Sequence, residues 1–255
     1  HKDAFSLAKK LKIELFSTLF SIRAINFLKK FNVKLFKISS FEITDTNLIL
    51  NIAKTKKPII ISTGMASIKD IRNCIKIIKK YHKKIIILHC VSGYPTNENQ
   101  ANLNRIKNLN KLFPEYNIGL SDHTNDILTS LSSIPLGIKI IEKHFVYNKK
   151  VKSLDSKFSI DPKKLKELSL KTKRVFDSLG NGKFELQNSE KKSINYRRSI
   201  FTIQKIKKGE KFSKNNISTF RPLIGLPADK YLNILGKRAK KNIDAFSPVF
   251  KSYLK

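Results

Sequence analysis

The chain has 255 residues, of which 40% are hydrophobic and 28% are charged, which is the composition of a globular protein and excludes a disordered one. Its apolar runs fall short of the roughly 18 residues that a membrane-spanning helix needs, so we expect no membrane partner. The net charge of +33 comes mainly from lysines spread along the whole chain, which predicts weak binding to polyanions and no specific nucleic-acid partner.

Short apolar runs alternate with amphipathic stretches in the first part of the chain. We predict that the apolar runs are strands and that helices lie between them. The predicted strands are Ile13–Thr18, Lys34–Ser40, Pro58–Gly64, Lys84–Cys90, Asn117–Thr124 and Ile138–Phe145. Nearly continuous apolar strands indicate a sheet that is buried on both faces, and hence a parallel sheet. Ser21, Asp45 and Ser67 are residue types that favour helix N-termini, so we expect helices to begin there.

Frequent alternation of strand and helix is typical of a doubly wound sheet or of a (β/α)8 TIM barrel. The barrel is favoured because polar residues follow many different strands, whereas a doubly wound sheet gathers them at one switch point. These residues are Thr18, Lys37, Ser40, Thr63, His89, Ser121, His123 and His144. Six strands are apparent and the chain begins with a helical pattern, so we expect an N-terminally truncated barrel without its first two β/α units.

The character of the sequence changes after Leu179. Residues 181–196 are polar and charged, which is typical of a linker. Residues 197–255 contain short apolar runs, a Lys-Lys-Gly-Glu turn and one short helical pattern, which indicate a small β-rich domain. The predicted organisation is therefore a TIM-barrel domain over residues 1–180, a linker over 181–196 and a second domain over 197–255.

A series of motifs in both domains resembles the sialic acid synthase family. In chain order they are FSTLFS, KISSFEITD, KPIIISTGMAS, LHCVSGYPT, ANLNRI, GLSDHT, IEKHF, RRSIF, KKGEKFSKNNI, RPLIGL and LGKRAKKNI. They cover almost the whole chain, and their order and spacing make the resemblance specific. The resemblance implies a barrel that condenses phosphoenolpyruvate with an N-acylated amino sugar, followed by a C-terminal antifreeze-like (SAF) domain.

The resemblance identifies His123 and His144 as ligands of a divalent metal, with waters and a substrate oxygen as the remaining ligands. Two imidazoles with oxygen partners suit Mn²⁺ or Mg²⁺ better than a closed zinc site. The alternative is a pair of hydrogen-bonded histidines at the rim of a barrel. Asp122 matches no assigned family position, so it is interpreted either as a carboxylate that supports the metal ligands or contacts substrate, or equally as a member of a structural salt bridge. His89 lies inside its strand and is interpreted as a core histidine.

Lys37 and Glu42 are the predicted catalytic residues. Lys37 ends an apolar strand, where an unpaired ammonium would be costly, and it matches a family position that binds phosphoenolpyruvate. Thr18, Ser40 and Ser121 match positions that bind oxygens of the same substrate. Glu42 matches a glutamate that handles protons or orients water, and its alternative is a carboxylate at the entry of a helix.

Further substrate-binding residues are predicted by the same resemblance. They are Ser92, Tyr94, Glu142, Asp155 and Arg221. The segment with Ser92 and Tyr94 matches one that contacts phosphoenolpyruvate and the sugar, and Glu142 matches a position near the sugar. The alternatives are a packed rim aromatic for Tyr94 and a solvated turn for Arg221. Ser92 stands where some family members carry the longer Asn, which we expect to tune specificity. Asp155 is the one residue of the segment Lys152–Asp155 that keeps the usual family pattern. Arg221 matches an arginine that reaches the active site of the partner subunit, which implies a domain-exchanged homodimer.

The implied enzyme is a transferase that joins phosphoenolpyruvate to N-acetylmannosamine or a related sugar and forms a sialic-type nonulosonic acid and phosphate. Legionaminic or pseudaminic acid synthesis is the alternative of the same class. An alternative of another class is a truncated, non-catalytic remnant that binds a sugar acid or a partner. Cys74 and Cys90 lie in apolar patterns without CxxC spacing, so we expect reduced thiols in a cytoplasmic protein.

Overall fold

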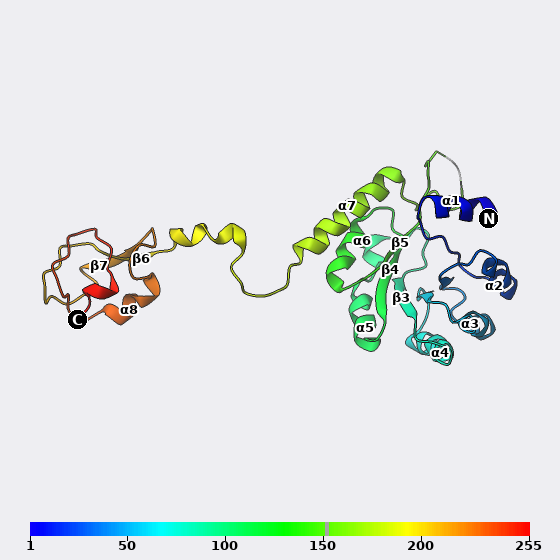
Figure 1. Ribbon diagram of the computed structural model, residues 1–255, viewed down its shortest axis with the longest axis horizontal. Coiled ribbons are helices and arrows are strands. Elements are labelled where there is room, and N and C mark those ends of the chain that lie inside the picture. Colours follow the sequence, from blue (N-terminus) through cyan, green and yellow to red (C-terminus); the bar gives the residue numbers. More distant parts are fainter. Residues whose placement is uncertain (151–152) are drawn as a thin grey trace. The chain divides into compact units, whose positions relative to one another are not determined.

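Figure 1 shows the computed structural model, which describes residues 1–150 and 153–255. The chain divides into two compact units, His1–Asn181 and Gly182–Lys255. Lys152, the first residue of the segment that contains Asp155, lies outside the described residues. Within the described part of the chain, each helix is too short or too polar to cross a membrane.

The first unit contains a parallel sheet whose strands pair in chain order, and five strands belong to it among the described residues. They are β1 (Phe36–Ile38), β2 (Ile59–Ser62), β3 (Ile85–Cys90), β4 (Asn117–Asp122) and β5 (Ile141–Lys143). The sheet curls with the helices on its outer side, as in part of a barrel (Figure 1). The predicted α/β class and the predicted partial barrel are therefore confirmed.

Helices separate the strands, and the three predicted N-caps define where three of these helices begin. The helices of this unit are α1 (Lys2–Lys10), α2 (Ile22–Lys29), α3 (Thr46–Ala53), α4 (Ile68–Lys79), α5 (Asn104–Leu112), α6 (Leu128–Ser133) and α7 (Pro162–Ser178). The side chains of Ser21, Asp45 and Ser67 each accept a hydrogen bond from a backbone N–H three residues further on. These bonds satisfy donors that the helix itself leaves free, so α2, α3 and α4 start there.

The segment Ile13–Thr18 was predicted to be a strand, and this prediction is wrong. Only Thr18 pairs with the sheet, through one isolated parallel bridge to Lys37. Lys12 has a φ of +56°, so the chain turns just before this segment. Ile13 is 61% exposed, and the segment therefore lacks the burial that favours a central strand.

The last predicted strand of the barrel, Ile138–Phe145, is shorter than expected. Its pairing with β4 ends at Lys143. Beyond that point Phe145 makes an isolated parallel bridge with Ile160, and the N–H of Ile160 donates to the carbonyl of His144. The residues after β5 therefore turn away from β4 and pair with a later segment.

The second unit has its own small core. Its strands β6 (Ser199–Thr202) and β7 (Ile217–Phe220) pair in antiparallel fashion, and α8 covers Tyr231–Ile234. The core contains Ile200, Ile206, Phe212, Ile217, Ile234, Ala239, Ile243 and Val249. Short 3-10 helices in the two units cover Glu98–Gln100, Ile134–Leu136, Asn188–Glu190, Ser193–Tyr196, Ala228–Lys230 and Lys251–Tyr253.

Gly119 in β4 provides a test of the packing between the strands. A Cβ at this position would lie 2.5 Å from Leu88 Cδ2 and 2.7 Å from the backbone oxygen of Ile140. We predict that Gly119→Ala lowers the free energy of unfolding by about 1–3 kcal/mol, because backbone must shift to admit the methyl group. Urea denaturation measures this change. The control Lys107→Ala, on the exposed face of α5, should change it by less than about 0.5 kcal/mol; equal stability of both variants would contradict the prediction.

Candidate active site

A cavity of about 390 Å³ lies at the C-terminal ends of the strands of the first unit. Parallel strands present their C-terminal ends at one edge of the sheet, so residues far apart in the sequence meet there. The predicted site residues that line this cavity are Thr18, Lys37, Ser40, Tyr94, Ser121, His123, Glu142 and His144. The structure thus brings most of the predicted site together, while the chemical role of each residue stays a prediction.

Lys37 places a buried positive charge in the cavity. Its side chain extends from β1, and the residue is only 8% exposed. The Nζ atom donates a hydrogen bond to Ser62 Oγ at 2.9 Å and lies 3.3 Å from Glu142 Oε1. Glu142 also accepts a hydrogen bond of 2.7 Å from Ser121 Oγ. These partners offset the cost of burying the ammonium and leave it able to bind an anionic oxygen.

Ser40 and Ser92 come from different loops and pack against the same glycine. The N–H of Gly64 donates to Ser40 Oγ at 3.0 Å. A Cβ on Gly64 would lie 2.7 Å from Ser40 Cβ and 2.1 Å from Ser92 Oγ, so only glycine permits this approach. Ser92 Oγ also lies 3.8 Å from the thiol sulfur of Cys90, which lines the cavity. Ser92 therefore lies directly behind the cavity wall.

His123 follows β4, and its imidazole is held in one orientation. The Nδ1 atom lies 2.8 Å from the carbonyl oxygen of Val91. A carbonyl accepts hydrogen bonds only, so Nδ1 carries the proton and Nε2 keeps its lone pair. The backbone oxygen of His123 accepts the N–H of Thr96, which ties the same loop to β4 a second time. Burial lowers the pKa of His123, so the imidazole is neutral near pH 7.

His144 is oriented in a similar way by Asp155. Its Nδ1 lies 3.3 Å from Asp155 Oδ2, and its ring centroid lies 5.2 Å from that of His123. Burial is the main cause that lowers the pKa of His144, and the neighbouring His123 lowers it further. The rings of Tyr94 and Phe158 lie 5.9 Å and 4.9 Å from the His144 ring and form an aromatic wall beside it. The geometry therefore places Asp155 against a histidine of the site.

Four predicted site residues do not line the cavity: Ser92 and Asp155, which contact residues of its wall as described above, and Glu42 and Arg221. The carboxylate of Glu42 accepts a hydrogen bond from the hydroxyl of Ser39, and it is Ser39 that lines the cavity. Arg221 belongs to the second unit, where it is exposed and precedes Pro222 in a cis peptide bond. The predicted roles of Glu42 and Arg221 stay predictions.

Two interpretations of neighbouring residues are settled by their contacts. His89 is buried and its Nε2 lies 2.8 Å from the carbonyl oxygen of Ala101, as expected for a core histidine. Asp122 forms the structural salt bridge that was one of its two interpretations, with its Oδ2 2.9 Å from Lys143 Nζ. Both side chains are nearly fully buried, and they lie outside the group of residues predicted to bind substrate.

Ser62 and Phe158 are site residues that the sequence analysis missed. Ser62 ends the apolar run of β2 and shares the strand-end position of the residues that were singled out, so that position could have revealed it. Phe158 has no such signal, because its sequence context does not distinguish it from a core phenylalanine. Its contact with His144 arises from the bridge between Phe145 and Ile160, which a single sequence does not show.

Comparison with known proteins places the chain in a family. Residues 1–184 match the NeuB family, and residues 197–254 match the SAF domain. The chain is 39% identical to the N,N'-diacetyllegionaminic acid synthase of Campylobacter jejuni, over 95% of this chain and 73% of the relative. It is 38% identical to a pseudaminic acid synthase of Campylobacter jejuni, over 96% of this chain and 71% of the relative.

A solved structure shows the same relationship. The crystal structure of N-acetylneuraminic acid (sialic acid) synthetase from Leptospira borgpetersenii superposes with a TM-score of 0.71 and 37% identity, over 76% of this chain and 68% of that one. The cavity described above lies within the part of the chain that matches the NeuB family. The chain therefore belongs to the NeuB family of sugar acid synthases and carries a C-terminal SAF domain.

Proposed function

We propose that the protein condenses phosphoenolpyruvate with an N-acyl amino sugar and forms a nonulosonic acid and phosphate. In this reaction C3 of phosphoenolpyruvate bonds to the aldehyde carbon of the open-chain sugar, water attacks C2, and phosphate leaves with its C–O bond broken. The observation that carries the proposal is the single cavity in which the Lys37 ammonium, the Glu142 carboxylate and the imidazoles of His123 and His144 meet.

Phosphoenolpyruvate is the more anionic substrate, and the proposal assigns it to the Lys37 side of the cavity. The buried ammonium gains most from an anionic ligand, because water screens it little. The hydroxyls of Thr18, Ser40 and Ser121 lie at the same strand ends and can donate hydrogen bonds to phosphate or carboxylate oxygens. Binding at this point leaves the histidine side of the cavity for the sugar.

His123 and His144 fit a divalent ion that is completed by water and substrate oxygens. Within residues 1–150 and 153–255, no group of three or more His, Cys, Asp and Glu side chains is placed to hold a metal. Each of the two imidazoles, however, engages its Nδ1 with an oxygen and keeps Nε2 for coordination, as metal-bound histidines do. When bound there, Mn²⁺ or Mg²⁺ would polarise the aldehyde oxygen of the sugar.

Two carboxylates are available for the proton transfers of the reaction. Glu142 lies inside the cavity and is proposed to contact the sugar. Glu42 accepts the hydroxyl of Ser39 at the cavity wall and is proposed to orient the attacking water from there. Tyr94 and Asp155 complete the proposed sugar side, since they contact the histidines. Ser92, which lies beside Cys90, is assigned to this side by the resemblance.

The proposal names two candidates for the acceptor sugar. N-acetylmannosamine is the first candidate, because the HCVSGYP segment resembles neuraminate and legionaminate synthases. A sugar with two acylamino groups is the second candidate, and it is favoured by the name of the N,N'-diacetyllegionaminic acid synthase relative.

The test incubates the purified chain with phosphoenolpyruvate, MnCl₂ and one acceptor at a time, and measures phosphate release and the nonulosonic acid by mass spectrometry. Product from either acceptor supports a synthase and identifies the sugar. Binding of phosphoenolpyruvate without turnover of either sugar supports the non-catalytic alternative.

The assembly and the location of the protein are also proposals. A domain-exchanged homodimer would place Arg221 of one copy in the cavity of the other, where it would bind the acyl group of the sugar. A cytoplasmic location agrees with Cys74 and Cys90, which are both buried free thiols. Burial raises the pKa of the Cys74 thiol to about 12, so this thiol is unreactive.

We predict that Lys37→Met lowers kcat/KM for phosphoenolpyruvate by about 10²- to 10³-fold, because the variant loses the buried cation but keeps the length of the side chain. Steady-state phosphate release measures the change. Lys34→Met is the matched control, since the Lys34 side chain is 76% exposed and pairs with Glu14 at the surface. Wild-type kcat/KM in Lys37→Met would contradict the assignment of phosphoenolpyruvate to this side of the cavity.

Metal affinity should depend on pH through the two imidazoles. Both pKa values lie below the ordinary value of 6.5, so the neutral, metal-binding form persists down to that pH. We predict that the affinity for Mn²⁺ is constant from pH 8 to about pH 7 and falls once the pH drops below the lowered pKa values. Isothermal titration calorimetry with MnCl₂ measures it, and an affinity that already falls tenfold between pH 8 and about pH 7 would exclude these imidazoles as ligands.

The domain-exchanged dimer predicts complementation between two inactive variants. In a mixed dimer of Lys37→Met and Arg221→Ala chains, one cavity receives both defects and the other receives none. Random mixing of the two chains should therefore restore roughly a quarter of the wild-type activity. The measurement is phosphate release after the two variants are unfolded together and refolded, with each variant refolded alone as the control. A mixture that is no more active than its components would exclude a shared site.

A further inference from the structure

Asp122 and Lys143 form a buried ion pair at the end of the β4–β5 ladder, where Lys143 also lines the cavity. They lie directly opposite each other in the ladder, one position beyond the Ser121–Glu142 pair. Since side chains alternate along a strand, Ser121 and Glu142 point into the cavity, whereas the Asp122 carboxylate reaches Ser130 of α6 and the Lys143 ammonium reaches Asp122. The side chains of the pair are 1% and 3% exposed. A charged pair this far from water needs a structural or functional reason.

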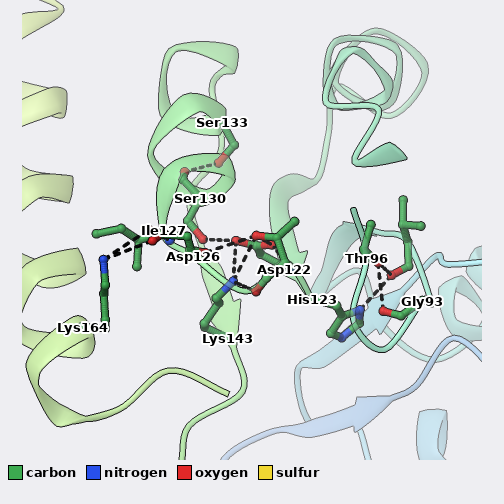
Figure 2. A network of polar contacts seen from close by, with 12 residues as sticks. Gly93, Thr96, Asp122, His123, Asp126, Ile127, Ser130, Ser133, Lys143 and Lys164 are labelled. Atoms are coloured by element: carbon green, nitrogen blue, oxygen red, sulfur yellow. Dashed lines mark hydrogen bonds and ion pairs between the residues drawn. The ribbon is translucent and has the colours of Figure 1, made fainter. Parts of the chain in front are cut away.

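The pair closes a network that surrounds the backbone of His123 (Figure 2). The carboxylate of Asp122 accepts hydrogen bonds from the N–H and the hydroxyl of Thr124, both at 2.8 Å, and from Ser130 Oγ at 2.5 Å. Lys143 Nζ lies 2.9 Å from Asp122 Oδ2 and donates to the carbonyl oxygen of Thr124 at 2.5 Å. One ammonium thus holds the residue before His123 and the residue after it.

The same ammonium also determines where His144 lies. Lys143 directly precedes His144, and the pairing between β4 and β5 ends with Asp122 and Lys143. His123 and His144 are therefore one residue beyond the last paired position. Among the contacts between the described residues of β4 and β5, the buried pair is the one closest along both strands to the two histidines.

We infer that Asp122 and Lys143 are positioning residues that set the separation and orientation of the His123 and His144 imidazoles. The inference rests on the metal site of the proposed function and adds to it two residues whose charged groups bond to each other and to Thr124. Groups that orient metal ligands from behind commonly change metal affinity by about 10- to 100-fold when they are replaced. A pair that only stabilised the fold would change stability and leave the affinity of the folded protein unaltered.

The experiment uses the full chain and MnCl₂ alone as the probe, with isothermal titration calorimetry as the readout. The main variant is Asp122→Asn/Lys143→Met, which removes both charges with little change in side-chain volume. Replacing both members of a buried ion pair is tolerated far better than removing one, so this variant should fold. We expect its Kd for Mn²⁺ to rise about 10- to 100-fold while urea denaturation still shows a cooperative transition.

A matched control is the nearby pair between Asp126 and Lys164, which Figure 2 also shows. Its Nζ and Oδ2 atoms are 3.2 Å apart, and the two side chains are 50% and 37% exposed. Lys164→Met removes this ion pair beside the same helix and should leave the Kd for Mn²⁺ unchanged. Thr124→Val is the second test variant, since it deletes only the hydroxyl that joins Asp122 to Lys143. It should weaken Mn²⁺ binding by a smaller factor, and it decides the question if the main variant does not fold.

Two further variants, His123→Ala and His144→Ala, separate the possible failures. If both abolish Mn²⁺ binding but folded Asp122→Asn/Lys143→Met and Thr124→Val bind it with the wild-type Kd, the positioning role is overturned and the proposed function stands. If the wild-type chain binds no Mn²⁺, or if both histidine variants keep the wild-type Kd, the proposed metal site is wrong and the inference fails with it.

Discussion

The parallel ladder between β4 and β5 determines which side chains meet on each face of the sheet. Ser121 lies opposite Glu142, and Asp122 lies opposite Lys143. A shift of the pairing by one residue would exchange the two faces of a strand. Glu142 would then point away from the Lys37 ammonium, and its neighbour Lys143 would take its position facing Lys37. The cavity and the buried pair beside it are therefore two consequences of one register.

An anion that enters the cavity must compete with the Glu142 carboxylate for the Lys37 ammonium. Lys37 is already hydrogen-bonded to Ser62 and lies 3.3 Å from Glu142. An anionic substrate oxygen can share this ammonium only by weakening its interaction with Glu142. These contacts hold the Lys37 side chain in one place within the cavity, where the proposed function assigns phosphoenolpyruvate.

Much of the arrangement could be predicted from where polar residues follow apolar runs. Lys37, Ser121, Glu142 and His144 line one cavity because strand ends of a parallel sheet converge, and this rule needs no knowledge of loops. The strand predicted at Ile13–Thr18 failed because an apolar pattern does not reveal exposure: Ile13 is 61% exposed, and only Thr18 pairs with β1.

The residues that lie opposite each other on neighbouring strands could not be predicted from the sequence, for a related reason. The choice between a substrate contact and a salt bridge for Asp122 depended on which residue of the next strand lies opposite, and register is not visible in a single sequence. Glu42 shows the same limit within a loop, because its contact with Ser39 is set by a local turn.

The contact of Ser40 and Ser92 over Gly64 links two positions that lie on different loops. Ser92 belongs to the loop that is proposed to face the sugar, and its oxygen occupies the space that a side chain at position 64 would need. The two positions are therefore coupled: a longer side chain at position 92 requires that position 64 remain glycine. Substitutions at position 92 can therefore be tolerated while position 64 stays glycine. A side chain at position 64 would exclude longer residues at position 92 and, under the proposed function, a change of acceptor sugar through that position.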